Sequence, residues 1–184
     1  MLAAVDDDRA PIIGVVLARS MKFQPFLQSC VPGDDMSGTW RPRAIRGVPD
    51  NLILFDGVCV LCSQWVRFVI DRDVSAQFRF VPIQSSYGLS LARRLRIDAK
   101  NPETNAVVIG EQAYFKSDAV IHVLDRLPRL SWLAIFGFVP RPLRDWAYDR
   151  LARNRYRLFG KTETCIVPTP EAVRRFFFDD PRSR

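Results

Sequence analysis

The segment "LILFDGVCVLCSQWVRFVI" constrains the fold more than any other part of this chain. Its four leading apolar residues (52–55) are typical of a short strand that is buried on both faces. Asp56-Gly57 then predicts a turn, and a helix is expected from near Cys59 to about Arg72. The helix is indicated by apolar side chains that recur every four residues and so share one side, namely Leu61, Trp65 and Val69.

The segments that follow alternate between the two kinds of regular structure. We expect a strand at 77–83, a helix at 85–96, two strands joined at Gly110-Glu111 within 105–115, and a helix at 117–127. Ser85 or Ser86 would cap the first of these helices, and Ser117 the second. Two parallel strands joined by a helix, then a hairpin and a helix, form the arrangement of thioredoxin. The predicted fold class is therefore α/β, a thioredoxin-like three-layer fold.

The rest of the chain is interpreted as additions to this core. We expect a poorly ordered N-terminal extension (1–49), the thioredoxin-like core (50–128), a C-terminal helical addition packed on the core (129–172), and a tail (173–184). Within the addition, residues 141–160 predict a basic amphipathic helix, because Pro142 suits a first helical turn and Gly160 suits a helix end. The arginines are expected to face water, while a core is expected to receive Leu143, Trp146, Ala147, Leu151 and Leu158.

The basic charge is confined to the C-terminal third of the chain. The net charge is +7, yet residues 1–125 hold 14 basic and 14 acidic residues, whereas residues 126–184 hold 13 and 6. Such a segment could attract acidic partners, nucleic acid or anionic lipid, but a solvated face is the favoured interpretation. We therefore expect no nucleic-acid binding, and peripheral membrane contact is the less favoured alternative. The oligomeric state is left open.

The N-terminus and the apolar runs bear on where the protein resides. No apolar run reaches the roughly 20 residues that cross a membrane. Acidic residues (6–8) stand where a signal peptide would carry basic ones, so we expect a cytoplasmic protein. In that compartment, the four cysteines are not expected to form structural disulfides.

Cys59 and Cys62 form a C-x-x-C pair at the predicted junction of strand and helix. A helix N-terminus offers unpaired N–H groups and a dipole that favour a thiolate, and the spacing allows the two sulfurs to form a disulfide. We favour a redox pair over half of a metal site or two packed side chains. Cys59 would be the exposed attacking thiolate, and Cys62 the buried thiol that resolves the mixed disulfide.

Asp56 is the third candidate site residue and precedes Cys59 in the same predicted turn. Its carboxylate could relay protons to and from the thiols, although its charge would oppose thiolate formation. Alternatively, Asp56 forms the turn with Gly57 and accepts backbone hydrogen bonds. The second interpretation is slightly favoured.

The opening segment, together with "FRFVPIQS", "SDAVIHVL" and "VPRPLRDWAYDRLARNRYRLFG", resembles the DCC family, which is named for an Asp-Cys-Cys motif. The resemblance covers about residues 51–172 and matches the motif to Asp56, Cys59 and Cys62. It implies a thioredoxin-like thiol-disulfide oxidoreductase. From the cysteine pair we expect an enzyme of the protein-disulfide reductase type, with a protein or small-molecule disulfide as substrate, a thiol donor as the source of electrons, and no bound cofactor. The alternative function is a non-enzymatic thioredoxin-like module whose arginine-rich helix binds an acidic partner.

The chain departs from thioredoxin-like redox proteins at the proline that these usually place before the third strand, opposite the cysteines. Here Pro102 lies a few residues early, and Thr104 or Asn105 is expected nearer that place. His122, the only histidine, is expected to be packed or half exposed on its helix. A zinc site from both C-x-x-C cysteines, Cys165 and His122 would be chemically acceptable, but no spacing brings these residues together. We therefore expect no metal.

Overall fold

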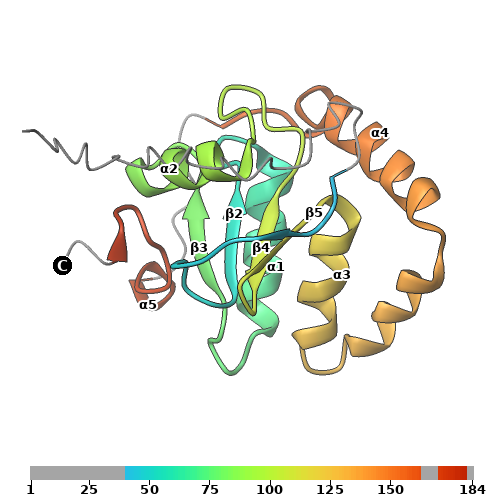
Figure 1. Cartoon of the computed structure of the whole chain (residues 1–184), viewed down its shortest axis with the longest axis horizontal. Helices are drawn as coiled ribbons and strands as arrows, with labels where there is room; N and C mark the ends of the chain where they lie inside the picture. The colour runs from blue at the N-terminus through green and yellow to red at the C-terminus, as the bar shows by residue number, and fades with distance from the viewer. Residues whose placement is uncertain (1–39, 163–169, 182–184) are drawn as a thin grey trace, which may run out of the picture. The chain divides into compact units, whose positions relative to one another are not determined.

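A five-stranded sheet, in the order β1-β5-β4-β2-β3, organises residues 40–162 and 170–181, which the computed structural model describes (Figure 1). The parallel strands β2 (Leu52–Phe55) and β3 (Arg79–Pro82) are connected by helix α1 (Val60–Arg72). On its other side β2 pairs antiparallel with β4 (Ala106–Ile109), which continues through a hairpin into β5 (Gln112–Phe115). This order is consistent with the predicted thioredoxin-like α/β fold.

Helices cover both faces of the sheet, so that each face has its own apolar core. Helix α2 (Ser86–Leu95) packs on one face, where Leu52 and Leu54 of β2 are buried. Helices α1 and α3 (Lys116–Arg126) cover the other face, where the alternate residues Ile53 and Phe55 are buried. The run of four apolar residues in β2 is therefore continuous because neither face of this strand meets water.

The two predicted helix caps have different outcomes. Ser85 caps α2, since its side chain accepts a hydrogen bond from the Gly88 N–H at 3.0 Å. Ser117 is not a cap, because α3 begins one residue earlier, at Lys116. The Ser117 hydroxyl instead donates to Asp145 and accepts from Arg144 at 3.2 Å. A residue that was predicted to cap its own helix thus bonds instead to residues of a helix that is distant in the sequence.

An edge strand, β1 (Arg43–Ala44), pairs antiparallel with β5 and was not predicted. It lies within the segment that was expected to form the extension (1–49), and Ile45 beside it is buried. Residues 1–39 lie outside the described residues, as do residues 163–169 with Cys165. The proposed division into extension, core, addition and tail therefore stays a prediction.

The C-terminal residues return to the sheet beside β3, after the short helix α5 (Pro170–Val173). The Phe80 N–H donates to the Arg175 carbonyl, and the Phe177 N–H donates to the Phe80 carbonyl, each at 2.9 Å. Phe176 is buried between these bonds and packs edge-on against Phe55, with ring centroids 6.2 Å apart. The tail thus contributes an aromatic side chain to the core beneath α1.

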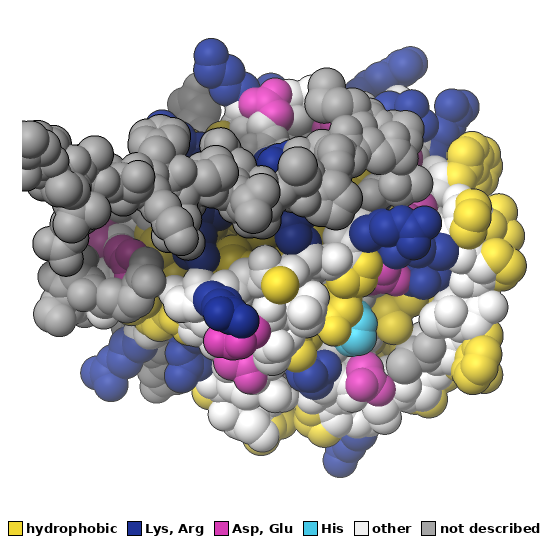
Figure 2. Space-filling model, in the orientation of Figure 1, with side chains coloured by type: hydrophobic (Ala, Val, Ile, Leu, Met, Phe, Trp, Pro, Cys, Tyr) yellow, Lys and Arg dark blue, Asp and Glu magenta, His cyan; other side chains and the backbone are white. Residues whose placement is uncertain are grey.

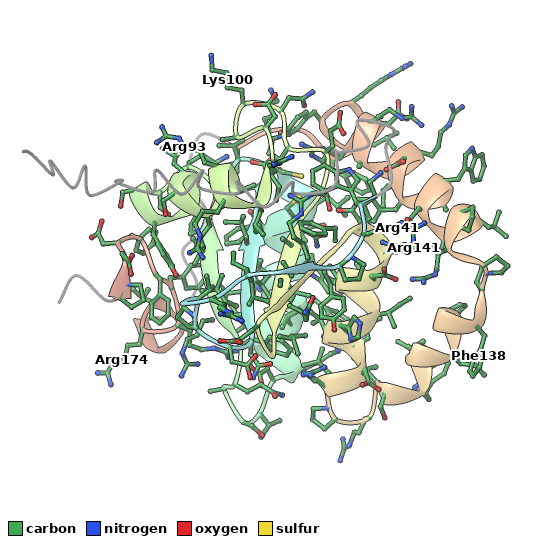
Figure 3. The ribbon with its side chains drawn as sticks, viewed as in Figure 1. Arg41, Arg93, Lys100, Phe138, Arg141 and Arg174 are labelled. Carbon is green, nitrogen blue, oxygen red and sulfur yellow. The ribbon has the colours of Figure 1, made fainter. Side chains whose placement is uncertain are left out.

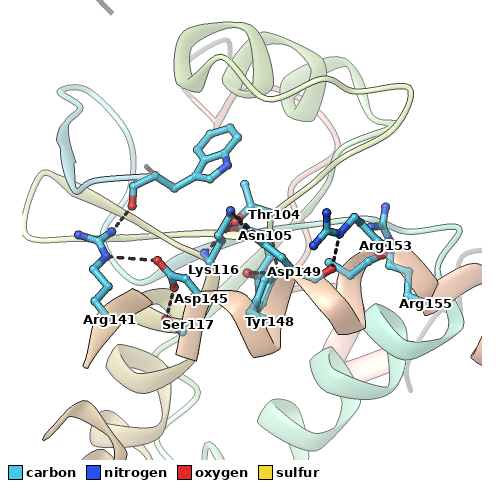
Figure 4. Close-up of polar contacts among 12 residues, drawn as sticks. Thr104, Asn105, Lys116, Ser117, Arg141, Asp145, Tyr148, Asp149, Arg153 and Arg155 are labelled. Atoms are coloured by element: carbon cyan, nitrogen blue, oxygen red, sulfur yellow. Dashed lines mark hydrogen bonds and ion pairs between the residues drawn. The ribbon is translucent and has the colours of Figure 1, made fainter. Parts of the chain in front are cut away.

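Helix α4 (Arg141–Phe159) is held to the core by polar side chains (Figure 4). Lys116 pairs with Asp149 at 2.8 Å, and the Tyr148 hydroxyl donates to Asn105 at 2.9 Å. The predicted apolar contact with the core is wrong, because all five residues expected there are exposed: Leu143, Trp146, Ala147, Leu151 and Leu158. Every residue of α4 is described, and only Arg155 is buried.

These apolar residues of α4 are exposed because α4 lies outside α3, at the right edge of Figure 1. Its inner side meets charged and hydroxyl groups of α3, and the 3-10 helix η1 (Ser131–Phe138) leads into it along α3. Buried carboxylates and hydroxyls on the core require cationic or hydrogen-bonding partners, and α4 supplies them at the expense of its apolar contacts. Among the described residues, no helix is long and apolar enough to cross a membrane.

Candidate functional site

The N-terminus of α1 brings the two predicted redox cysteines together. Cys59 is the N-cap residue, with extended backbone angles of φ −87° and ψ 118°. Its sulfur accepts a hydrogen bond from the Cys62 N–H at 3.3 Å, and its carbonyl accepts from the Ser63 N–H at 3.0 Å. Both cysteines are free thiols. The predicted position of Cys59 at the strand-to-helix junction is thus confirmed, with its sulfur taking the role of a capping oxygen.

The exposure of the two cysteines is the reverse of the prediction. Cys59 has 0% of its surface exposed, whereas Cys62 is half-buried. The backbone of Lys161 lies antiparallel to Cys59 as an isolated β-bridge, and the Thr162 N–H donates to the Val58 carbonyl at 2.9 Å. The chain that leaves α4 therefore runs alongside Cys59 and buries it. This contact could not be predicted from the spacing of the two cysteines.

The pKa values of the two thiols, in contrast, favour Cys59 as the attacking thiolate, as predicted. The pKa of Cys59 is lowered from 9.0 to about 7, mainly by a hydrogen bond from the Cys62 thiol and further by the Cys62 N–H. The pKa of Cys62 is raised far above its ordinary value, because its proton is held by the Cys59 sulfur and because its side chain is partly removed from water. Near neutral pH about half of the molecules thus carry a thiolate, and that thiolate lies on Cys59 while Cys62 keeps its proton.

Asp56 lies buried in the turn before the cysteines, with 3% of its surface exposed. One carboxylate oxygen accepts from the Gln84 side chain at 2.8 Å and from the Val58 N–H at 3.2 Å. The other oxygen accepts from the Tyr156 hydroxyl and from the Arg155 guanidinium at 3.4 Å. The negative charge of Asp56 raises the pKa of both cysteines, and the positive charge of Arg155 lowers it. The backbone bond to Val58 is the turn interaction that was favoured for Asp56.

Arg155 and Tyr156 are site residues that the sequence analysis did not identify. Arg155 was expected among the water-facing arginines, yet only 6% of it is exposed, and its guanidinium lies 4.3 Å from the centre of the Tyr156 ring. Both belong to the "RNRYRLFG" stretch that supported the family resemblance. That stretch was a signal of importance, but nothing in it indicated a contact with Asp56, about 100 positions away.

A cavity of about 650 Å³ opens beside Cys62, between α1, α3, η1 and α4. Most of the side chains that line it are apolar, including Leu61, Trp65, Val120, Leu124, Leu133 and Phe136. A smaller hollow also reaches Cys62 and is lined by Pro102, Thr104 and Asn105. The loop before β4 therefore faces Cys62 across this hollow, on the side where thioredoxin-like redox proteins were expected to carry their proline.

His122 lies on α3 and is half-buried. Its ring packs on Tyr114 with centroids 3.8 Å apart, and its pKa is lowered by burial and by Arg126. Cys165, the remaining member of the zinc set that was considered, lies outside the described residues. Within residues 40–162 and 170–181, no three His, Cys, Asp or Glu side chains are grouped closely enough to hold a metal ion.

Comparisons with known proteins found a family model and curated proteins to which this chain is similar. Residues 53–161 match the family model of DCC1-like thiol-disulfide oxidoreductases. The uncharacterized protein YuxK of Bacillus subtilis (strain 168) is 37% identical over 131 residues, which cover 70% of this chain and 95% of that protein. The DCC family protein At1g52590, chloroplastic, of Arabidopsis thaliana is 34% identical over 118 residues, which cover 62% of this chain and 67% of that protein. No solved structure matches the chain.

Proposed function

Because this chain belongs to the family of DCC1-like thiol-disulfide oxidoreductases, we propose that Cys59 and Cys62 are its redox-active pair. The observation that carries the proposal is the Cys59 sulfur at the N-cap of α1, with a pKa of about 7. Near neutral pH about half of such a thiol is ionised, and the thiolate is the form that attacks disulfides. The proposed activity is that of a protein-disulfide reductase, with a cytosolic thiol donor as the source of electrons.

The first step is attack by the Cys59 thiolate on one sulfur of the substrate disulfide. The substrate S–S bond breaks, a mixed disulfide forms at Cys59, and the other substrate sulfur leaves as a thiolate that takes up a proton. We assign this step to Cys59 although it is buried, because Cys62 keeps its proton as long as Cys59 is ionised. The pairing of Lys161 and Thr162 beside Cys59 is short, and a local opening would admit the substrate.

The second step is attack by Cys62 on the Cys59 sulfur. Once Cys59 is in a mixed disulfide, it carries no charge and no longer holds the Cys62 proton, which removes the largest cause of the raised pKa of Cys62. Cys62 then loses its proton, attacks, and releases the second substrate thiol. The substrate disulfide has gained two electrons, and the pair has become a disulfide that a thiol donor can reduce.

A redox titration of the purified full chain tests this proposal. The protein is equilibrated in glutathione buffers, its thiols are alkylated, and the products are identified by mass spectrometry. We expect one reversible Cys59–Cys62 disulfide with a midpoint between about −220 and −320 mV, the range of cytosolic glutathione. If the pair stays reduced across that range, or if the protein carries stoichiometric zinc, the redox assignment is wrong.

Single-cysteine variants test the order of attack. The Cys62→Ser variant should trap a mixed disulfide at Cys59, and the Cys59→Ser variant should lose insulin reduction. A stable mixed disulfide at Cys62 in the Cys59→Ser variant would reverse the order of the two sulfurs.

We further propose that Asp56 positions the turn and does not relay protons, because four donors already occupy its carboxylate. The Asp56→Asn variant removes a like charge, so the pKa of Cys59 should fall and the pH profile of disulfide reduction should move to lower pH. A reduced rate at every pH with an unmoved profile would instead favour a relay. Asp71→Asn, at an exposed position of α1, is the control that should change neither.

A further inference from the structure

The exposed side chains of η1 and α4 form an apolar surface, which we call the outer face. Within the described residues, nine of the twelve large apolar side chains that are exposed lie between residues 132 and 159. Phe138 is 89% exposed, and Figure 3 shows its side chain pointing away from the molecule. Figure 2 shows hydrophobic side chains gathered along the right edge of the molecule, with basic side chains beside them. A cluster of this kind indicates an interaction site, since apolar residues exposed singly are normal but a cluster is not.

Unpaired positive charge accompanies these apolar side chains. The acidic residues of α4, Asp145 and Asp149, are both engaged by cations, Asp145 by Arg141 at 3.4 Å and Asp149 by Lys116 at 2.8 Å. Three further arginines of α4 are exposed and have no ion pair within the described residues: Arg150, Arg153 and Arg157. The outer face is therefore both apolar and cationic, and its partner must be apolar and anionic.

This combination distinguishes among the partners that could cover the outer face. A second copy of the chain would bring the same unpaired arginines together, and like charges repel. Nucleic acid would satisfy the arginines but offers nothing to aliphatic side chains such as Ile135 and Leu158, which are 60% and 64% exposed. An anionic membrane offers lipid phosphates to the arginines and an acyl boundary to the apolar groups, and its interface favours tryptophan. Trp132 and Trp146 are both exposed on this face.

We propose that the outer face binds the surface of an anionic membrane, with η1 and α4 at the lipid headgroups. The expectation of a solvated basic helix assumed that its apolar residues were buried against the core, and the structure removes that assumption. Leu143, Trp146 and Leu151 belong both to the outer face and to the lining of the Cys62 cavity, so that binding would bring this cavity to the bilayer. Membrane binding and disulfide exchange are separate properties, and each can fail without the other.

Vesicle binding by the full chain tests this proposal. The protein is mixed with vesicles of phosphatidylcholine alone, or of phosphatidylcholine with a minority of phosphatidylglycerol, and binding is measured by co-sedimentation and tryptophan fluorescence. We expect binding to the anionic vesicles, little to the neutral ones, and a loss of binding as salt is added, because salt screens exposed charges.

Two kinds of variant separate the apolar and the cationic contributions. Phe138→Ser should lower the partition coefficient about tenfold or more, since a large side chain no longer enters the bilayer. Arg150→Gln and Arg157→Gln should each lower it about fivefold, the effect of one basic residue near an anionic surface. The matched controls are Val74→Ser, at a position 86% exposed between α1 and β3, and Arg93→Gln, on the opposite side of Figure 3 from Phe138.

Four outcomes would overturn the proposal. The first is no binding to anionic vesicles by a folded protein, judged by circular dichroism. The second is equal binding to neutral and anionic vesicles that salt does not weaken. The third is a loss of binding in the control variants that equals the loss in the outer-face variants. The fourth is a dimer in sedimentation velocity without lipid that Phe138→Ser dissociates, since the occupant of the outer face would then be a second copy.

Discussion

Replacing Cys62 with alanine should turn Cys59 into a thiol that is almost fully protonated at neutral pH. The hydrogen bond from the Cys62 thiol is the largest cause of the lowered pKa of Cys59. Two influences that raise this pKa, the burial of Cys59 and the charge of Asp56, remain in the variant. The backbone N–H of Cys62 also remains and continues to favour the thiolate, but less strongly than the thiol does.

The size of the effect follows from the two pKa values. A pKa of about 7 leaves half of the Cys59 thiols ionised at pH 7, whereas a pKa of 9.0 leaves about one in a hundred. The thiolate fraction at pH 7 should therefore fall by roughly ten- to fiftyfold in the Cys62→Ala variant, the smaller value allowing for the retained N–H. Alkylation of Cys59 and any reaction that starts from its thiolate should slow in proportion.

Ultraviolet absorbance of the thiolate measures this change without a reagent that must reach the buried sulfur. The Cys59→Ser variant provides the blank, because it retains the other cysteines but not the transition of Cys59. Cys62→Ser is the matched control, since its hydroxyl can still donate a hydrogen bond and should preserve much of the lowered pKa. If Cys62→Ala retains a transition near pH 7, the N-terminus of α1 alone stabilises the thiolate, and the Cys62 thiol does not lower the pKa of Cys59.

Two further predictions concern stability and are measured by urea denaturation. Gly88→Ala should destabilise the fold by about 3 kcal/mol, because the new Cβ would lie 1.9 Å from the Pro82 carbonyl oxygen. Gly137→Ala should change little, since its Cβ would meet its nearest neighbour at 3.8 Å, and a large loss there would refute the steric explanation. Phe176→Ala should cost about 3–5 kcal/mol, because Phe176 fills the core beneath α1. Phe178→Ala, at a position 45% exposed, should cost less than about 1 kcal/mol, and equal losses at both positions would show that the tail is not anchored by Phe176.

The parts of the fold that could be predicted from the sequence are those that local pattern determines. The apolar run of β2 and the capping residue Ser85 are examples, and so is the hairpin turn, where Gly110 and Glu111 both adopt positive φ. Strand β1 could not be predicted, because two residues show no periodicity and only the pairing with β5 makes them a strand. Ser117 was misassigned for a related reason, since its partner Asp145 is 28 positions away.

The same distinction applies to the candidate site. The spacing of Cys59 and Cys62 was enough to predict that both lie at the start of α1, but the burial of Cys59 depends on the later segment at Lys161. Arg155 has no periodicity that separates it from the exposed arginines of α4. In the interior its charge is compensated by the buried carboxylate of Asp56, and such a pairing is a property of the folded chain.

The contact of Arg155 and Tyr156 with Asp56 also links two regions in their unfolding. If the end of α4 detached, the Asp56 carboxylate would remain buried without its cation, which costs about 3–5 kcal/mol in proteins. Detachment of α4 and opening of the cysteine turn should therefore be one cooperative event. In native-state hydrogen exchange, the amides of the first turn of α1 and the last turns of α4 would then report the same opening free energy. The cysteine turn and helix α4 would form a single thermodynamic unit, although about a hundred residues of chain separate them.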